Sequence, residues 1–438
     1  MPDRYPVFSP AEMARRREAL TDLLREHGAD QALVYGFDRS GSAVEWLTGW
    51  PVTREAALLL RPGQRDLLFV CFNNHVPNAR RLAPDADVRP GNASALEAAL
   101  DALATRADRR AATPPRSGPA RPRRPARLAR LGVIGPVPAR ASDRLAAVGR
   151  IVFLDREYTA LRLVKSAEEL ARMRTGAAMS DDAVAALAAA ARPGMTEAEC
   201  CASLEGAYIA AGGLTYIHYL GVTAMAEPGL CVPAQWPSPR RLRAGDVLTC
   251  EVSASYQGYP GQLLRTFTIA APATPLYGDM HRVAEAAFGA MAARLRAGAA
   301  ASDLAAAAAE IILGAGYTIY DDLVHGFGGG YLPPVISRAD LESGRTAAPP
   351  ARRPSAGNFT SAPPARRPPA GNFTSAAPAR LPSAGNFTFA AGMTVVLQPN
   401  VITPDERAGV QTGELVLVTE SGWEPLHRYP RGLARIGG

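Results

Sequence analysis

Four stretches in the second half of the chain combine acids, amides and glycines at close spacing: Gly245–Phe267, His325–Pro334, Gly392–Pro399 and Gly409–Glu420. The first contains Glu251 and, eleven residues later, Gln262. The second opens with His325 in the sequence HGFGGG, whose glycines would let a ligand approach the backbone. Because carboxyl and imidazole groups are the usual general acids and bases, these residue types favour proton-transfer chemistry on a bound ligand.

Other polar and aromatic residues are candidates to complete the same pocket. His218, in TYIHYLG, is the second histidine that we expect to reach it, although a satisfied strand histidine is the alternative. Tyr256 and its aromatic neighbours could form walls, as small-molecule pockets usually require, or pack in the core. Arg265 could pair with Glu251 or hold a substrate carboxylate. Because buried polar groups must be paired, these side chains either satisfy one another or hold a ligand.

The N-terminal part of the chain alternates between helical and strand patterns. Apolar residues on one side, after a capping Ser9, predict a first helix over 10–27. Strands are expected over 31–37, 56–62, 66–72, 130–137 and 150–155, with further helices over 92–108 and 141–148. This alternation predicts an α/β domain over residues 1–155.

The C-terminal part repeats one design, in which two helices precede strands. Helices are expected over 167–190, 197–211, 278–297 and 302–313, and strands over 214–220, 247–256, 262–270 and 316–323. Capping boxes at Ser166–Glu169 and Thr196–Glu199 mark the starts of the first two helices. The recurrence indicates an internal duplication. It predicts a pseudo-twofold α+β domain over 156–438, with helices covering a curved antiparallel sheet.

Two segments look like linkers or loops rather than folded parts. Residues 106–130 hold nine arginines and one aspartate, which is more than the whole net charge of +7. The segment is rich in proline and has no aromatic residue, so we expect a solvated linker and no nucleic-acid partner. Residues 338–391 contain three proline- and arginine-rich copies of a fourteen-residue repeat. Such copies cannot form a core of their own, and we expect a loop.

The composition also indicates the cellular compartment in which we expect the protein. No apolar run approaches the length of a transmembrane helix, and the N-terminal residues lack the apolar segment of a secretory signal. The five cysteines show no metal-type spacing. We therefore expect a cytoplasmic protein that does not interact with a membrane.

The four stretches named above, taken in order, resemble the pita-bread family of prolidase, aminopeptidase P and creatinase. The resemblance spans nearly the whole chain: Trp46-Leu-Thr-Gly49 lies in a part similar to the creatinase-type N-terminal domain, and 156–438 resembles the catalytic domain. It implies a hydrolase fold, a small-molecule or short-peptide substrate, and a homodimer.

The peptidases of this family bind two divalent metal ions through five side chains. The resemblance places these ligands on Glu251, Gln262, His325, Gln398 and Gly413, with Glu414 one residue later. Only His325 keeps the family's residue type, and neutral glutamine carbonyls are weak ligands for such ions. We therefore expect a degenerate metal site and no metal cofactor, with one weakly held ion at Glu251, His325 and Glu414 as an alternative. Creatinase works without metal, and its catalytic histidine falls here on Gln235.

Three functions remain open at this point. The first is a metal-independent hydrolase of a C–N bond in a small polar molecule, with His325 as proton shuttle and Glu251 as orienter or base. Its substrate contacts would come from Gln262, Gln398, His218, Gln235, Arg265, Tyr256 and Glu414. The second is a non-catalytic pita-bread protein that binds a peptide or small molecule. The third is an Xaa-Pro metallopeptidase.

Overall fold

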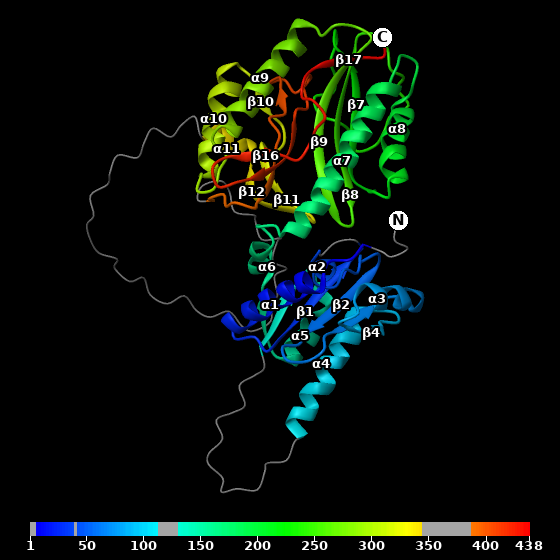
Figure 1. The fold of residues 1–438 in the computed structure, drawn as a ribbon, viewed down its shortest axis with the longest axis vertical. Coiled ribbons are helices and arrows are strands. Elements are labelled where there is room, and N and C mark those ends of the chain that lie inside the picture. Colours follow the sequence, from blue (N-terminus) through cyan, green and yellow to red (C-terminus); the bar gives the residue numbers. More distant parts are fainter. Residues whose placement is uncertain (1–5, 39–41, 113–129, 344–386) are drawn as a thin grey trace, which may run out of the picture. The chain divides into compact units, whose positions relative to one another are not determined.

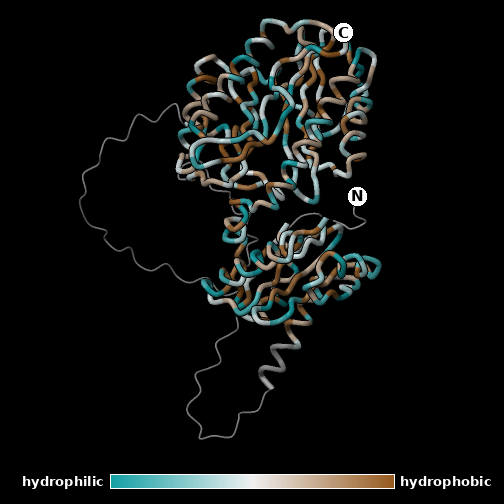
Figure 2. The backbone as a smooth tube through the Cα atoms, viewed as in Figure 1, coloured by the Kyte–Doolittle hydropathy of each residue, from teal (hydrophilic) through white to brown (hydrophobic). Residues whose placement is uncertain are grey.

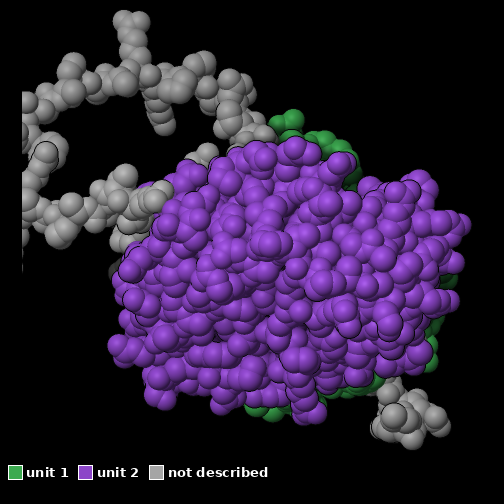
Figure 3. Space-filling model, turned by 90° about the horizontal axis from the view of Figure 1, so that it is seen from above, with its two compact units in different colours: residues 1–173, 256–260, 328–330 green, residues 174–255, 261–327, 331–438 purple. Residues whose placement is uncertain are grey.

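The chain forms two compact units, shown in different colours in Figure 3. The computed structural model describes residues 6–38, 42–112, 130–343 and 387–438, so most of the predicted linker and repeat segment lies outside the described residues. Unit 1 comprises residues 1–173, 256–260 and 328–330, and unit 2 comprises 174–255, 261–327 and 331–438. The predicted domain boundary after residue 155 stays a prediction.

Unit 1 is built on a six-stranded mixed sheet with the order β4-β3-β2-β1-β5-β6. The central strand β1 pairs antiparallel with β2 and parallel with β5. The strands are β1 Gln31–Phe37, β2 Glu55–Leu60, β3 Leu67–Val70, β4 Asp87–Pro90, β5 Arg130–Ile134 and β6 Arg150–Phe153. The helices are α1 Pro10–Glu26, α2 Ala43–Thr48, α3 Val76–Leu82, α4 Ala95–Ala112, α5 Ser142–Val148 and α6 Asp155–Leu161.

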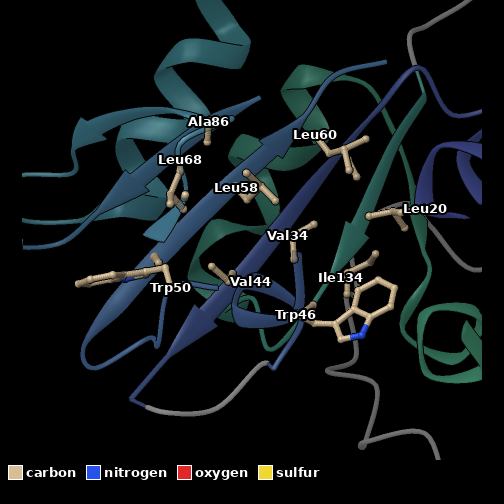
Figure 4. Close-up of a cluster of buried hydrophobic side chains, with 14 of the residues drawn as sticks. Leu20, Val34, Val44, Trp46, Trp50, Leu58, Leu60, Leu68, Ala86 and Ile134 are labelled. Carbon is tan, nitrogen blue, oxygen red and sulfur yellow. The ribbon is translucent and has the colours of Figure 1, made fainter. Parts of the chain in front are cut away.

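Both faces of this sheet are buried. Val34 and Leu58 belong to one hydrophobic core with Leu20 of α1, and Figure 4 shows these side chains meeting over the sheet. The alternate residues Leu33 and Leu59 belong to a second core with α4 and α5. Since successive side chains of a strand point to opposite faces, a sheet covered on both sides requires continuous apolar strands. The sequences QALVYGF and EAALLL meet that requirement.

Unit 2 contains a larger, antiparallel-paired sheet whose path runs β12-β11-β13-β15-β9-β8-β7. Strand β16 adds to β15, and β17 runs parallel to β9. The strands are β7 Leu214–Ala224, β8 Asp246–Tyr256, β9 Tyr259–Ile269, β11 Val324–Phe327, β12 Tyr331–Ile336, β13 Thr394–Leu397, β15 Gly413–Val418, β16 Trp423–Pro425 and β17 Ala434–Ile436. Strands β10 Thr318–Ile319 and β14 Val401–Ile402 form a separate pair.

The helices of this half are α7 Ala167–Ala190, α8 Glu197–Ala210, α9 Pro275–Ala292, α10 Ala301–Gly314 and α11 Arg338–Ser343. Two helices precede strands in each half of the repeat, as the sequence predicts, and Figure 1 shows α7 running beside β8 and β9. In Figure 2 hydrophobic colours run along the strands inside each unit. The capping box at Thr196 is present, because its hydroxyl accepts from the Glu199 N–H and the Glu199 carboxylate accepts from the Thr196 N–H.

The local structure differs from the sequence prediction in two respects. The strand expected over 316–323 is limited to the two residues of β10, and Asp321 and Asp322 follow it outside any strand. The short elements α2, α3 and β4 are absent from the sequence prediction, because none is long enough to show a periodic apolar pattern. In the described part of the chain, no helix is long and apolar enough to cross a membrane.

Candidate active site

Neighbouring strands of unit 2 bring Glu251 and Gln262 together. Glu251 lies on β8 and Gln262 on β9, and the Gln262 Nε2 donates to the Glu251 Oε1 at 2.5 Å. The Gln262 side chain is only 1% exposed. Within the described residues its carbonyl oxygen Oε1 meets no donor. A buried carbonyl without a donor is costly, so this atom is suited to accept a hydrogen bond from a ligand.

The carboxyl group of Glu251 is held mainly in its protonated form. Burial, and then the charges of Asp321 and Asp322, raise its pKa to about 8, and the hydrogen bond from Gln262 only partly opposes this. A carboxyl group with such a pKa carries a proton at neutral pH and can release it. It is therefore a candidate general acid.

His325 lies on β11, where its backbone faces Val396 of β13. Its ring stacks on Tyr331 with centroids 4.3 Å apart and meets the edge of Phe327 at 5.3 Å. Nδ1 lies 3.2 Å from the Gly326 carbonyl oxygen, which can only accept, so Nδ1 carries the proton and Nε2 is an acceptor in the neutral ring. Burial lowers the pKa of His325, which favours this neutral form.

A pair of acids directly before β11 was missed by sequence reasoning. Asp321 accepts from the Asn400 Nδ2 at 3.1 Å, while burial and the neighbouring Asp322 raise its pKa to about 7. The backbone oxygen of Asp322 accepts from the Gln398 Nε2 at 2.9 Å. The Gln398 Oε1 makes no hydrogen bond of standard geometry among the described residues, but the Gln398 side chain contacts the His325 ring and acts to raise its pKa against the effect of burial. The only sequence signal was an acidic doublet four residues before His325.

Asp322 acts electrostatically on residues of both β8 and β11. Its charge acts to raise the pKa of both Glu251 and His325, although burial dominates at the histidine. Burial raises the pKa of Tyr331, and the charges of Asp322, Asp321 and Glu251 raise it further. The structure therefore brings together Glu251, Gln262, His325 and Gln398, with Asp321 and Asp322 added.

Glu414 and Arg265 form a structural pair, contrary to their predicted substrate contacts. The Glu414 carboxylate accepts from the Arg265 Nη2 and from the Arg431 Nη1, each at 2.8 Å. Arg265 also donates to the backbone oxygens of Leu264, Gly413, Tyr429 and Pro430. All five of its donors are thus used. Arg265 pairs with Glu414 and not with Glu251, so neither residue is available to a ligand.

Gly413 has no room for a side chain. A Cβ placed there would lie 2.3 Å from the Leu397 carbonyl oxygen and 2.7 Å from the Gln398 Cα. Both contacts are with backbone, which cannot move aside as the end of a flexible side chain can. The position that aligns with the family's last glutamate ligand is therefore closed to glutamate in this backbone.

His218 lies on the other face of the sheet from Glu251. The partner of Glu251 across β7 and β8 is Tyr219, whereas His218 faces Val252. Because cross-strand partners share a face and successive residues alternate, His218 points away from the cluster. Its Nδ1 lies 2.9 Å from the Glu205 Oε1 on α8. The predicted role of His218 at the pocket is therefore wrong.

Two further predicted contacts find no support in unit 2. Gln235 is exposed, and its neighbour Trp236 is 83% exposed, so this loop presents no aromatic wall. Tyr256 is grouped with unit 1. Among the residues that the structure describes, no group of three or more histidine, cysteine, aspartate or glutamate side chains is arranged to hold a metal ion.

The sequence profile of metallopeptidase family M24 matches residues 171–420, more than half of the chain. The chain belongs to metallopeptidase family M24. This confirms the pita-bread family resemblance. The match contains every strand that carries the cluster, from β8 to β15. The family consists of peptidase-like hydrolases of C–N bonds.

Individual relatives of this M24 chain agree with that assignment. Probable dipeptidase PepE of Mycobacterium tuberculosis is 30% identical over 174 residues, which are 39% of this chain and 44% of that protein. The match thus spans less than half the length of this curated relative. The X-Pro aminopeptidase of Thermotoga maritima matches over 96% of this chain and 99% of its own, at TM-score 0.72 and 18% identity. Dipeptidase PepE of Mycobacterium ulcerans matches over 98% and 100%, at TM-score 0.71 and 21% identity. These structures confirm the two-part fold class.

Proposed function

We propose that this M24 chain is a hydrolase that cleaves a C–N bond of a small polar substrate without a bound pair of metal ions. The observation that carries the proposal is two buried glutamine carbonyl oxygens: that of Gln262 meets no donor in the described structure, and that of Gln398 has no standard hydrogen bond there, although its side chain contacts the His325 ring. They lie in a cluster with a protonated acid and a neutral histidine. A substrate with N–H groups, such as an amide or amidine, would supply the missing donors.

The side chains at the family's ligand positions do not fit two divalent ions. Two such ions are normally balanced by several carboxylates, whereas two of the positions here are neutral glutamines. Glu414 already accepts from two guanidinium groups, and the backbone at Gly413 excludes a side chain. Glu251 is the one carboxylate left among these positions, and it is mostly protonated at neutral pH. No step of the proposed reaction is therefore assigned to a metal.

The protonation states of His325 and Glu251 suit opposite roles in hydrolysis. Neutral His325 can take a proton from water at Nε2 as the water oxygen attacks the substrate carbon and a C–O bond forms. Protonated Glu251 then donates its proton to the leaving nitrogen, and the C–N bond breaks. The proton on His325 passes back to Glu251 through solvent. This assignment makes Glu251 the acid, whereas the sequence suggested an orienter or base.

The test is a product-release assay over peptide amides, lactams and guanidino compounds, with and without EDTA. We expect turnover of at least one class that EDTA leaves unchanged. Glu251→Gln should reduce it about 10²–10⁴-fold, the usual contribution of a general acid or base. Glu205→Gln is the matched control, because that carboxylate contacts His218 on the other face of the sheet. It should retain activity.

Two outcomes would contradict the proposal. Activity that is lost with EDTA and restored by manganese or zinc would indicate an Xaa-Pro metallopeptidase. Binding of a substrate class without turnover, unaffected by Glu251→Gln, would indicate a non-catalytic binding protein. The homodimer and the cytoplasmic location stay predictions, and sedimentation of the full chain tests the first.

A further inference from the structure

Unit 1 contains a cavity of about 530 Å³. Every residue that lines it belongs to that unit, and it shares no residue with the cluster of unit 2. Its apolar wall includes Met13, Trp46, Leu58 and Leu82. A cavity of this size with apolar walls and a few polar groups is typical of small-molecule sites.

Two of the arginines at this cavity are neutralised by acids of unit 1. The Arg16 Nε donates to the Glu12 carboxylate at 2.6 Å, and its Nη2 lies 3.3 Å from the Glu169 carboxylate. The Arg17 Nε donates to the Asp66 carboxylate at 2.8 Å. Since these guanidinium groups have carboxylate partners, their presence at the wall is explained by the fold.

Arg162 and Arg172 differ, because neither has a carboxylate partner among the described residues. The Arg162 guanidinium donates to the Ser42 hydroxyl at 2.5 Å and to the carbonyl oxygens of Gly328 and Gly329 at 2.9 and 2.6 Å. Arg172 lies 3.5 Å above the Phe8 ring and donates once, to the Pro6 carbonyl at 3.3 Å. These hydrogen-bond partners are neutral, and Glu168 acts on Arg172 only through its charge, without an ion pair. Neither guanidinium therefore has a direct carboxylate partner among the described residues, and N–H groups of Arg172 remain available there.

The one acid on which both arginines are seen to act does not cancel their charge among the described residues. Glu45 also lines the cavity, and Arg162 and Arg172 both act to lower its pKa. Burial outweighs them, so the pKa of Glu45 is raised above its usual value and its carboxyl is a weaker acid. Partly buried cations without a counter-charge are unfavourable, and a bound anion would relieve that cost.

We propose that this cavity binds a small organic acid, whose carboxylate lies between Arg162 and Arg172 and whose apolar body packs against Met13, Trp46 and Leu82. The planar guanidinium group presents paired donors that match the two oxygens of a carboxylate. The apolar wall favours a hydrocarbon body over a bare inorganic anion. The proposal stands independently of the proposed hydrolase activity, because no residue of the unit 2 cluster takes part.

The experiment is isothermal titration calorimetry of the full chain with three probes that share one apolar body: 4-phenylbutyrate, 4-phenylbutanol and 4-phenylbutylamine. We expect the acid to bind at least tenfold more tightly than the alcohol, and the amine not to bind. Arg172→Met should reduce the affinity for 4-phenylbutyrate at least tenfold and leave that for the alcohol unchanged. Arg144→Met is the control, because Arg144 pairs with Glu97 and Asp101 away from the cavity.

A second variant guards against loss of folding. Arg162→Met should give the same loss for the acid, and circular dichroism and the melting temperature of each variant show whether unit 1 is folded. Equal affinity for all three probes would overturn the proposal, as would no binding of 4-phenylbutyrate at millimolar concentration. Tight binding of the acid to a folded Arg172→Met, Arg162→Met double variant would overturn it as well.

Discussion

The buried carboxyl of Glu251 couples the stability of the protein to pH. Its pKa is about 8 in the fold, compared with 4.5 in an exposed glutamate, so the folded chain holds a proton that the unfolded chain has released between these values. Stability from this group is therefore fully present below about pH 4.5 and is lost as pH rises toward 8. We expect the free energy of unfolding of the wild type to fall from pH 5 to pH 8, and Glu251→Gln to fall less. Urea unfolding at each pH measures this.

The exposed Glu342 supplies the control for that measurement, because Glu342→Gln removes a carboxyl that lies at the surface. The free energy of unfolding of Glu342→Gln should follow that of the wild type at every pH. In Glu251→Gln some pH dependence of this free energy should remain below pH 7, because the pKa of Asp321 is also raised, to about 7. Parallel curves for wild type and Glu251→Gln between pH 7 and 8 would show that Glu251 is not buried as a protonated acid.

Gly413 gives a second prediction at the scale of one residue. A methyl group there would press against the Leu397 carbonyl oxygen and the Gln398 Cα, so Gly413→Ala should lower the free energy of unfolding by about 1–3 kcal/mol. Gly289→Ala is the matched control, because no atom lies within 4 Å of a Cβ at that helical position. It should be neutral or raise stability by up to about 1 kcal/mol. Thermal denaturation that ranks Gly413→Ala above Gly289→Ala in stability would refute the crowding argument.

At the scale of elements, Ser180 fixes helix α7 to the two strands that carry Glu251 and Gln262. Its buried hydroxyl donates to the Gly261 carbonyl of β9 at 2.6 Å and accepts from the Ala254 N–H of β8 at 2.8 Å. Ser180→Ala leaves both backbone groups without this partner, which should cost about 1–3 kcal/mol. Ser203→Ala, on the exposed side of α8, removes a solvent-accessible hydroxyl and should cost less than about 0.5 kcal/mol. Similar losses of stability from both variants would contradict the conclusion that Ser180 fixes α7 to β8 and β9.

Local patterns predicted most elements of this fold, because each element of sufficient length carries its own signal. The apolar runs of β1 and β2, the capping box at Thr196 and the repeated order of helices and strands are all local features. Which face of the sheet a side chain occupies is not a local feature. His218 was placed at the pocket because one residue of register decides its face, and only the pairing with Val252 fixes that register. The Arg265–Glu414 pair joins residues 149 apart, and no spacing rule predicts it.

The acids beside the site show a different limit of sequence reasoning. Asp321 and Asp322 fell inside a predicted strand, so their side chains were not considered as neighbours of Glu251. Their effect arises from burial, which raises the pKa of Asp321, and from a long-range approach of the β10–β11 loop to β8. The sequence thus predicted the residues at the family's ligand positions. The acids that set the protonation of Glu251 were identified only in the tertiary structure.

At the scale of the whole molecule, the proposed function requires that the chain neither carries nor needs divalent metal. Ions held tightly enough to exceed their dissociation constant 1,000-fold in solution would stabilise the fold by about 4 kcal/mol. For a chain of 438 residues, with an unfolding entropy of about 2.1 cal/mol/K per residue, such a gain raises the melting temperature by roughly 4–5 °C. We expect manganese, cobalt and zinc to shift it by less than about 2 °C, and EDTA to leave it unchanged, because the glutamines and the occupied Glu414 offer too little negative charge. Mass spectrometry after metal loading should find less than about 0.1 equivalent bound. One or two equivalents with a matching rise in melting temperature would show that other side chains complete a metal site, and the metallopeptidase function would then replace the one proposed.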